Sequence, residues 1–167
     1  MGFLKNVVDL FNQPAQPANT SSPYRSNYSP QPLPSSFSFN VAGINYRMEN
    51  VMKLATPMKK WDMTKEQILQ KYGYKKIYRY YFTSEPVQLI PEPNNPQDPN
   101  AIKVIINNMH VGYVPQDDCS NVKALLNAGG YTINARFSGG EYKIISLNGD
   151  VYTDTERISI KIYFDKE

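Results

Sequence analysis

Apolar and polar residues follow different periods in the two parts of this 167-residue chain. Five apolar side chains near the N-terminus recur at helical spacing: Phe3, Leu4, Val7, Val8 and Phe11. This spacing predicts a short amphipathic helix over residues 1–12. An isolated helix of this length is marginal in water, so we expect it to dock on another surface. A protein surface is favoured over a membrane, because a single lysine attracts anionic lipid only weakly.

Residues 13–35 contain six prolines and few aliphatic side chains. A segment of this composition cannot bury enough apolar surface to offset the entropy that is lost on folding. We therefore predict an extended, disordered linker between the N-terminal helix and a domain over residues 36–167.

Within residues 36–167 the dominant pattern is short runs that alternate apolar and polar residues, which is typical of half-buried strands. We expect six or seven strands among eight candidate segments: residues 36–46, 74–84, 86–90, 100–106, 109–114, 131–138, 141–147 and 157–164. Short strands at this spacing favour a small antiparallel β-barrel or sandwich. The predicted fold is mainly β, with two or three helices.

Residues 48–73 interrupt the strand pattern with helical signals. Thr64 followed by Gln67 predicts a capping box at the start of a helix, and Gly73 is a natural residue to end it. We interpret 48–73 as a helical insertion in the β domain. A further helix is expected over 117–130, with acidic residues in its first turn.

Asparagine and glycine pairs mark predicted turns. Asn107 and Asn108 separate two strand patterns, and asparagine tolerates the positive φ that tight hairpins need. Gly129 is expected to end the helix over 117–130. The pair at Gly139 and Gly140 is expected to link two short strands.

The net charge is +3, too small to indicate a ligand class by itself, but the charges are unevenly distributed. Residues 36–91 hold nine Lys and Arg against four Asp and Glu. Residues 92–167 hold seven against ten. This asymmetry predicts one basic side on the folded domain.

Several classes of protein find no support in the sequence. Cys119 is the only cysteine, which excludes an intrachain disulfide and fits a reducing, cytoplasmic compartment. No apolar run approaches the ~20 residues of a membrane helix. His110 is the only histidine, so no catalytic pair with a serine or cysteine is visible. Asp117 and Asp118 stand where a helix N-terminus prefers acids. We expect no catalytic residues, no metal and no cofactor.

One stretch resembles the HIRAN domain family. Residues 92–104, "EPNNPQDPNAIKV", are followed by "VGYVP" at 111–115 and by a helix ending in "ALL". The residues that match the family pattern in order are Glu92, Pro93, Asn95, Pro96, Asp98, Asn100, Ala101, Ile102, Val111, Gly112, Tyr113 and Pro115. HIRAN domains occur in helicase-like DNA-repair proteins and as stand-alone modules in bacteria and mobile elements. The resemblance covers roughly residues 37–164, and this chain looks like the stand-alone bacterial or phage type.

The resemblance implies an OB-like small β-barrel that binds single-stranded DNA, with a pocket for a free 3′ end in eukaryotic members. The family's loop asparagines and aspartate correspond to Asn94, Asn95 and Asp98. Its aromatic pair after the first strand corresponds to Tyr46 and Arg47, so one aromatic is kept.

These residue types suit a terminal nucleotide. Asp98 can accept a hydrogen bond from a 3′ hydroxyl and would repel a phosphate at the same place. Asn94 and Asn95 offer amide donors and acceptors, Tyr46 can stack on a base, and Arg47 can stack or pair with phosphate. The alternative is that the asparagines and the aspartate only form turns, which is a common role of these residues. Tyr46 has the alternative of packing in the barrel wall.

Residues 75–82, "KKIYRYYF", interleave basic and aromatic residues. As one strand, this segment could track a nucleic-acid backbone with Lys75, Lys76 and Arg79 while its aromatic side chains stack on bases. The alternative is an edge strand whose lysines protect it from pairing with other chains.

The sequence therefore supports a non-catalytic module that binds single-stranded DNA or DNA 3′ ends. A rival hypothesis is a protein-interaction adaptor of a phage or mobile element, which uses the barrel and docks helix 2–12 into a groove. This rival is favoured by Gln97 and Gln116, which stand where the family often has a tyrosine and a basic residue. Nuclease activity from an unrecognised carboxylate set is a third hypothesis.

Overall fold

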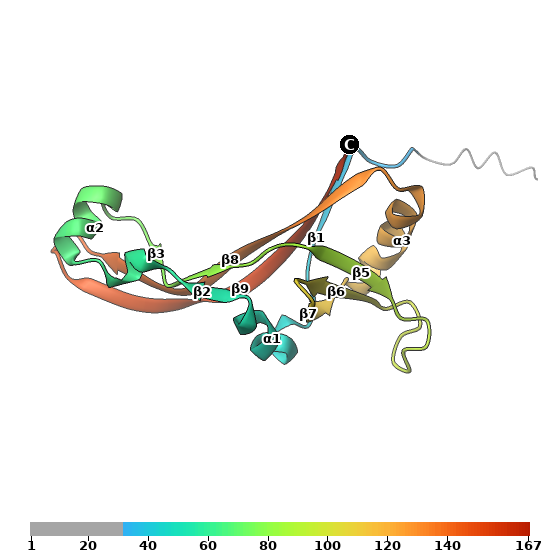
Figure 1. Ribbon diagram of the computed structural model, residues 1–167, viewed down its shortest axis with the longest axis horizontal. Coiled ribbons are helices and arrows are strands. Elements are labelled where there is room, and N and C mark those ends of the chain that lie inside the picture. Colours follow the sequence, from blue (N-terminus) through green and yellow to red (C-terminus); the bar gives the residue numbers. More distant parts are fainter. Residues whose placement is uncertain (1–31) are drawn as a thin grey trace, which may run out of the picture. The chain divides into compact units, whose positions relative to one another are not determined.

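The computed structural model describes residues 32–167 (Figure 1). The amphipathic helix predicted over 1–12 and most of the linker predicted over 13–35 lie outside the described residues. Those two interpretations therefore stay predictions.

The described strands form three antiparallel sheets. The largest contains, in spatial order, β1 (Ser36–Asn40), β9 (Val151–Lys166), β8 (Tyr131–Ile145) and β3 (Ile77–Tyr78). The second contains β5 (Val87–Pro91), β6 (Ile102–Ile106) and β7 (Met109–Tyr113), and the third contains β2 (Ala55–Pro57) and β4 (Tyr80–Phe82). The mainly β prediction is confirmed, but the strands described over 32–167 form separate sheets and no closed barrel.

The prediction of a turn at Gly139–Gly140 is wrong. Both glycines lie inside β8, which pairs with β9 over most of its length and shifts register between Ser138 and Gly140. A Cβ atom on Gly139 would lie 2.1 Å from the carbonyl oxygen of Arg157, so only glycine allows this close approach. The glycines therefore form a bulge in one long hairpin, where the sequence suggested two short strands.

The single strand predicted over 74–84 is also interrupted. It breaks at Arg79, whose backbone N–H donates to the carbonyl of Glu141 and whose carbonyl accepts from Met58. Before the break β3 pairs with β8, and after it β4 pairs with β2. The two halves belong to different sheets, so residues 74–84 do not form the single strand that was predicted.

The helices follow the local sequence signals closely. They are α1 (Met48–Lys53), α2 (Lys65–Tyr72) and α3 (Cys119–Ala128), with short 3₁₀ turns η1 (Ile44–Arg47), η2 (Lys59–Asp62) and η3 (Gln116–Asp118). The capping box of Thr64 and Gln67 is present, and Gly73 and Gly129 end α2 and α3 as predicted. The acidic pair before α3 lies in η3. None of the helices in residues 32–167 is long and apolar enough to cross a membrane.

The segment 48–73 is only partly helical. Between α1 and α2 the chain forms β2 and η2. Residues 55–57 are extended and not helical because they pair with β4. The turn at Asn107 and Asn108 is confirmed, since both residues have positive φ values of 45° and 63°.

Two hydrophobic cores hold these elements together. The main core contains alternate residues of β6 and β9 together with α3, including Ile102, Val104, Ile106, Val122, Leu125, Ile160, Ile162 and Phe164. A small second core of Ile68, Ile77 and Ile145 joins α2 and β3 to the end of β8, and so fixes α2 near the tip of the β8–β9 hairpin (Figure 1). Each fully buried aliphatic side chain stabilises the fold by about 1.5–3 kcal/mol.

The two glycines beside the contact between Ala42 and Tyr113 give a test of this packing. A Cβ atom on Gly112 would lie 2.3 Å from the carbonyl oxygen of Ala42 and 2.6 Å from Val41 Cγ1, whereas a Cβ atom on Gly43 would meet nothing within 4 Å. We expect Gly43→Ala to cost only the ~1–2 kcal/mol of its left-handed backbone conformation. Gly112→Ala should cost clearly more, because it also separates β7 from Ala42. Urea unfolding of both variants measures the difference, and equal losses would contradict this packing.

Candidate nucleic-acid interface

The loop between β5 and β6 is held by its own polar side chains. Asn95 Oδ1 accepts hydrogen bonds from the backbone N–H groups of Gln97 (2.9 Å) and Asp98 (3.3 Å). Asp98 Oδ1 accepts from the backbone N–H of Asn100 at 2.8 Å. Such contacts fix turns without a ligand. The turn-forming role weighed for Asn95 and Asp98 is therefore present, and their role toward a ligand stays a prediction.

A cleft of about 450 Å³ lies beside this loop. We call it the Tyr113 cleft, and its lining residues are Ile90, Pro91, Glu92, Pro93, Asn94, Asn95, Pro96, Lys103 and Tyr113. Two of the predicted site residues, Asn94 and Asn95, line the cleft, whereas Asp98 does not. Asp98 lies nearer α3, where its charge acts on Cys119.

An ion pair orders one wall of the Tyr113 cleft. Lys103 donates to Glu92, and Asn95 Nδ2 donates to the same carboxylate at 3.3 Å. The hydrogen bond from Lys103 lowers the pKa of the Glu92 carboxyl, and Glu92 in turn raises the pKa of Lys103. The loop is therefore fastened to β6, and both groups stay charged at neutral pH.

The segment carrying Tyr46 and Arg47 reaches the opposite side of Tyr113. Ala42 and Tyr113 exchange two backbone hydrogen bonds of 2.8 and 2.9 Å, and the chain then turns into η1, which packs on β7. The Tyr46 side chain is 89% exposed, so it does not pack in a wall of the domain. Arg47 lies close enough to Lys103 for its charge to oppose protonation of that lysine.

His110 lies in the same neighbourhood. Its ring packs edge-on against Tyr113, with 4.9 Å between ring centroids, and its Nε2 lies 3.0 Å from the carbonyl oxygen of Gly112. Burial lowers the pKa of the His110 imidazole, and the positive charge of Arg47 acts in the same direction. At neutral pH the side chain is therefore uncharged and can donate from Nε2.

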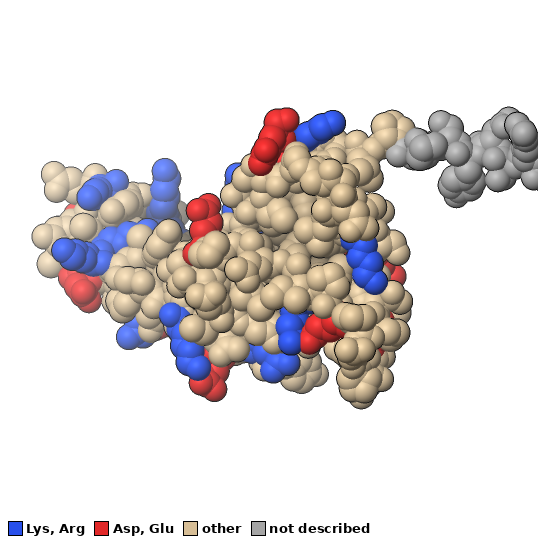
Figure 2. All heavy atoms as spheres, turned by 45° about the vertical axis from the view of Figure 1, so that its right-hand side comes forward, with Lys and Arg blue, Asp and Glu red and all other residues tan. Residues whose placement is uncertain are grey.

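The other three predicted residues are far along the hairpin and belong to a different surface. Lys75 is exposed, Lys76 forms an ion pair with Glu156, and Arg79 Nη1 lies 2.7 Å from Glu141 Oε2. The Lys76 and Arg79 charges are thus offset locally. Figure 2 shows Lys and Arg interspersed with Asp and Glu on one face of the described residues, with no continuous basic patch there.

Sequence reasoning missed two residues of the Tyr113 cleft. Lys103 lies between the buried Ile102 and Val104 of β6, so strand alternation alone points its side chain away from the core. Tyr113, named above only as a position that matches the family pattern, is half-buried with its side chain in the cleft. Within residues 32–167, no group of three or more His, Cys, Asp or Glu side chains is arranged to hold a metal ion.

The lowered pKa of His110 predicts a dependence of stability on pH. The unfolded imidazole binds its proton near the ordinary pKa of 6.5, whereas the folded one binds it only at lower pH. Stability is therefore complete above pH ~6.5 and is lost as the pH falls from there toward the folded pKa. We expect the unfolding free energy to fall as the pH is lowered through 6.5, and His110→Gln to flatten this slope. Urea titrations at several pH values measure it, and an unchanged slope in the variant would refute the assignment.

Comparison with known proteins gives the family. No curated protein matches this chain. A solved structure that matches is the crystal structure of the HIRAN domain of human HLTF, at 17% sequence identity, with 78% of this chain and 77% of that chain covered and a TM-score of 0.34. A family model described as the HIRAN domain matches residues 34–165. This match extends over most of the sequence and includes both the loop between β5 and β6 and the segment around Tyr46, so the chain belongs to the HIRAN domain family.

Proposed function

We propose that this chain binds single-stranded DNA without catalysis, with a free 3′ end held at the Tyr113 cleft and its loop. HIRAN domains are DNA-binding modules, which supplies the class of ligand. The observation that carries the proposal is that two distant segments meet on opposite sides of Tyr113. The loop over 92–100 lies on one side, and the segment from Ala42 to Arg47 lies on the other.

The groups around Tyr113 are suited to a strand of nucleic acid. Asn94 and Asn95 both line the cleft. The Oδ1 of Asn95 already accepts two backbone hydrogen bonds, so Asn94 is the amide that can both donate to and accept from a base edge, and Asn95 can only donate from its remaining N–H. The exposed ring of Tyr46 offers a stacking surface, and base–aromatic stacking is worth ~1–3 kcal/mol. Arg47 adds a cation that can pair with a phosphate. Tyr46 and Arg47 do not line the cleft themselves, but Arg47 is near enough to the lining residue Lys103 for its charge to act on it. In this proposal they bind the strand at the margin of the cleft.

Asp98 supports preference for a free end. Its backbone contact to Asn100 occupies one acceptor position, and an ionised carboxylate has about four. The remaining positions can accept from a 3′ hydroxyl. A 3′ phosphate would meet a like charge at the same place, so it should be disfavoured.

An exposed apolar group favours the protein-interaction adaptor as a second candidate function. Leu147, Val151 and Tyr152 gather near the tip of the β8–β9 hairpin and are all exposed. Neighbouring exposed apolar side chains often mark a protein contact. Salt dependence separates the two functions, because DNA-backbone binding weakens steeply with salt.

Variants at the margin of the cleft test DNA binding. We expect Tyr46→Ala to weaken binding of a short single-stranded oligonucleotide by ~1–3 kcal/mol through lost stacking. Arg47→Ala should weaken binding and reduce the slope of log K against log salt by about 1, because one phosphate contact is lost. Fluorescence anisotropy over a salt series measures both, with Lys166→Ala as a control of equal charge change. Absence of DNA binding by the wild-type chain at low salt would overturn the proposal.

Preference for a free end has its own test. The wild-type chain should bind an oligonucleotide with a 3′ hydroxyl more tightly than the same oligonucleotide with a 3′ phosphate. Asp98→Ala should abolish the difference, because it removes both the acceptor and the repelling charge. Competition binding with the two oligonucleotides measures it. Equal binding of both by the wild-type chain would leave single-strand binding without end recognition.

A further inference from the structure

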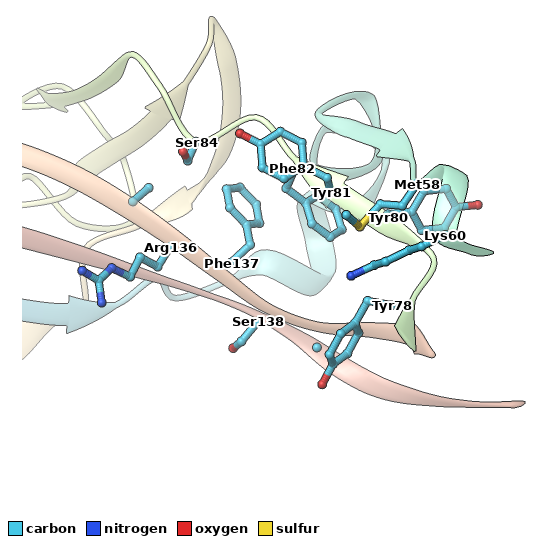
Figure 3. A pocket seen from close by; sticks show the side chains of 12 residues that line it. Met58, Lys60, Tyr78, Tyr80, Tyr81, Phe82, Ser84, Arg136, Phe137 and Ser138 are labelled. Atoms are coloured by element: carbon cyan, nitrogen blue, oxygen red, sulfur yellow. The ribbon is translucent and has the colours of Figure 1, made fainter. Parts of the chain in front are cut away.

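A second hollow lies between β4 and β8, and it shares no residue with the Tyr113 cleft. Its volume is about 490 Å³, within the range of small-ligand sites. The side chains relevant here are Lys60, Tyr78, Tyr80, Tyr81, Phe82 and Phe137 (Figure 3). We call this hollow the β4–β8 trough.

The walls of the β4–β8 trough are unusually aromatic. Phe82 from β4 and Phe137 from β8 are stacked, with 4.9 Å between ring centroids and 5° between ring planes. Tyr81 is 59% exposed and Tyr80 is half-buried, so both retain accessible ring surface. Aromatic rings with accessible faces bind nucleic-acid bases by stacking, with little preference among bases.

The charge of the trough is positive. Figure 3 shows the ammonium end of Lys60 directed into the space bounded by Tyr78, Phe82 and Phe137. No lining residue is acidic, and no carboxylate in residues 32–167 forms an ion pair with Lys60. The ammonium group lies 5.8 Å from the centroid of the Tyr72 ring, a contact that leaves its charge uncompensated. Such a cation suits a phosphate next to a stacked base.

Two polar side chains of β8 that line the trough make their contacts with β9 instead of with the trough. Arg136 also lines the trough, but its guanidinium is engaged elsewhere, since it stacks on the Tyr163 ring at 4.8 Å. Ser138 Oγ likewise makes its hydrogen bond to Ser159 at 2.8 Å. Lys60 is therefore the basic side chain that serves the trough.

We propose that the β4–β8 trough is a second nucleotide site, which stacks one base of a single strand against its aromatic side chains and pairs the adjoining phosphate with Lys60. This inference rests on the proposed function, because a chain that binds no single-stranded nucleic acid has no use for such a site. It adds a contact between β4 and β8, separate from the loop over 92–100 where the strand end is proposed to bind.

Two matched pairs of variants test the trough in the full chain. Tyr81→Ala and Lys60→Ala change lining residues, whereas Tyr74→Ala changes a tyrosine of similar exposure (55%) and Lys59→Ala changes the neighbouring lysine of η2, both outside the trough. With a single-stranded oligothymidylate at low salt, Tyr81→Ala should bind about 5-fold or more weakly than Tyr74→Ala. Lys60→Ala should show a smaller salt slope than Lys59→Ala. Because Tyr81 is exposed, its loss should leave the thermal unfolding temperature nearly unchanged.

Photocrosslinking gives a readout that does not depend on affinity. An oligonucleotide carrying 5-iodouracil should crosslink to the peptide over residues 78–82 in the wild-type chain, and Lys60→Ala should reduce the yield more than Lys59→Ala. The second nucleotide site would be ruled out if the wild-type chain binds, all four variants bind equally well and no crosslink forms in residues 78–82. The proposed function would still stand. Failure of the wild-type chain to bind any single strand would remove both.

Discussion

The antiparallel pairing of β9 with β8 on one side and with β1 on the other is the constraint on which the rest of the structure depends. It places Ile160, Ile162 and Phe164 in the main core, where the β5–β6–β7 sheet and α3 also bury their apolar faces. Strands β8 and β9 continue beyond this core. There β3 pairs with β8, and α2 packs against β3 and the end of β8. The Tyr113 cleft and the β4–β8 trough are therefore both positioned by one hairpin.

Turn formation in the loop over 92–100 is compatible with the binding role proposed for it. The side-chain oxygen of Asn95 accepts from the backbone of the turn, and its amide nitrogen donates to Glu92. Glu92 in turn forms an ion pair with Lys103. These contacts order the loop without a ligand, so binding need not include the entropy of ordering it. The polar side chains of the loop therefore hold its backbone in one conformation.

Local signals in the sequence predicted local structure well. Three correct predictions each depend on residues that are neighbours in the sequence. They are the capping box at Thr64, the turn at Asn107 and the family resemblance of residues 92–104. The errors concern partners far away in the chain. Gly139 signals a turn by residue type, but its conformation is set by the close approach of the Arg157 carbonyl. The trough was missed for the same reason, since Lys60 and Phe137 meet only through the fold.

The small second core has a consequence for the outer part of the β8–β9 hairpin, which it joins to β3 and α2. We call this part the outer arm. Among residues 32–167, its buried side chains are Ile68, Ile77 and Ile145, whereas the main core is several times larger. Regions with few buried contacts open at a fraction of the global unfolding free energy, as separate cooperative units. The outer arm should therefore behave as its own foldon, with amide protons in α2 exchanging sooner than those of β6. Opening of this outer part would then leave the main core, and with it the β5–β6–β7 sheet, in place.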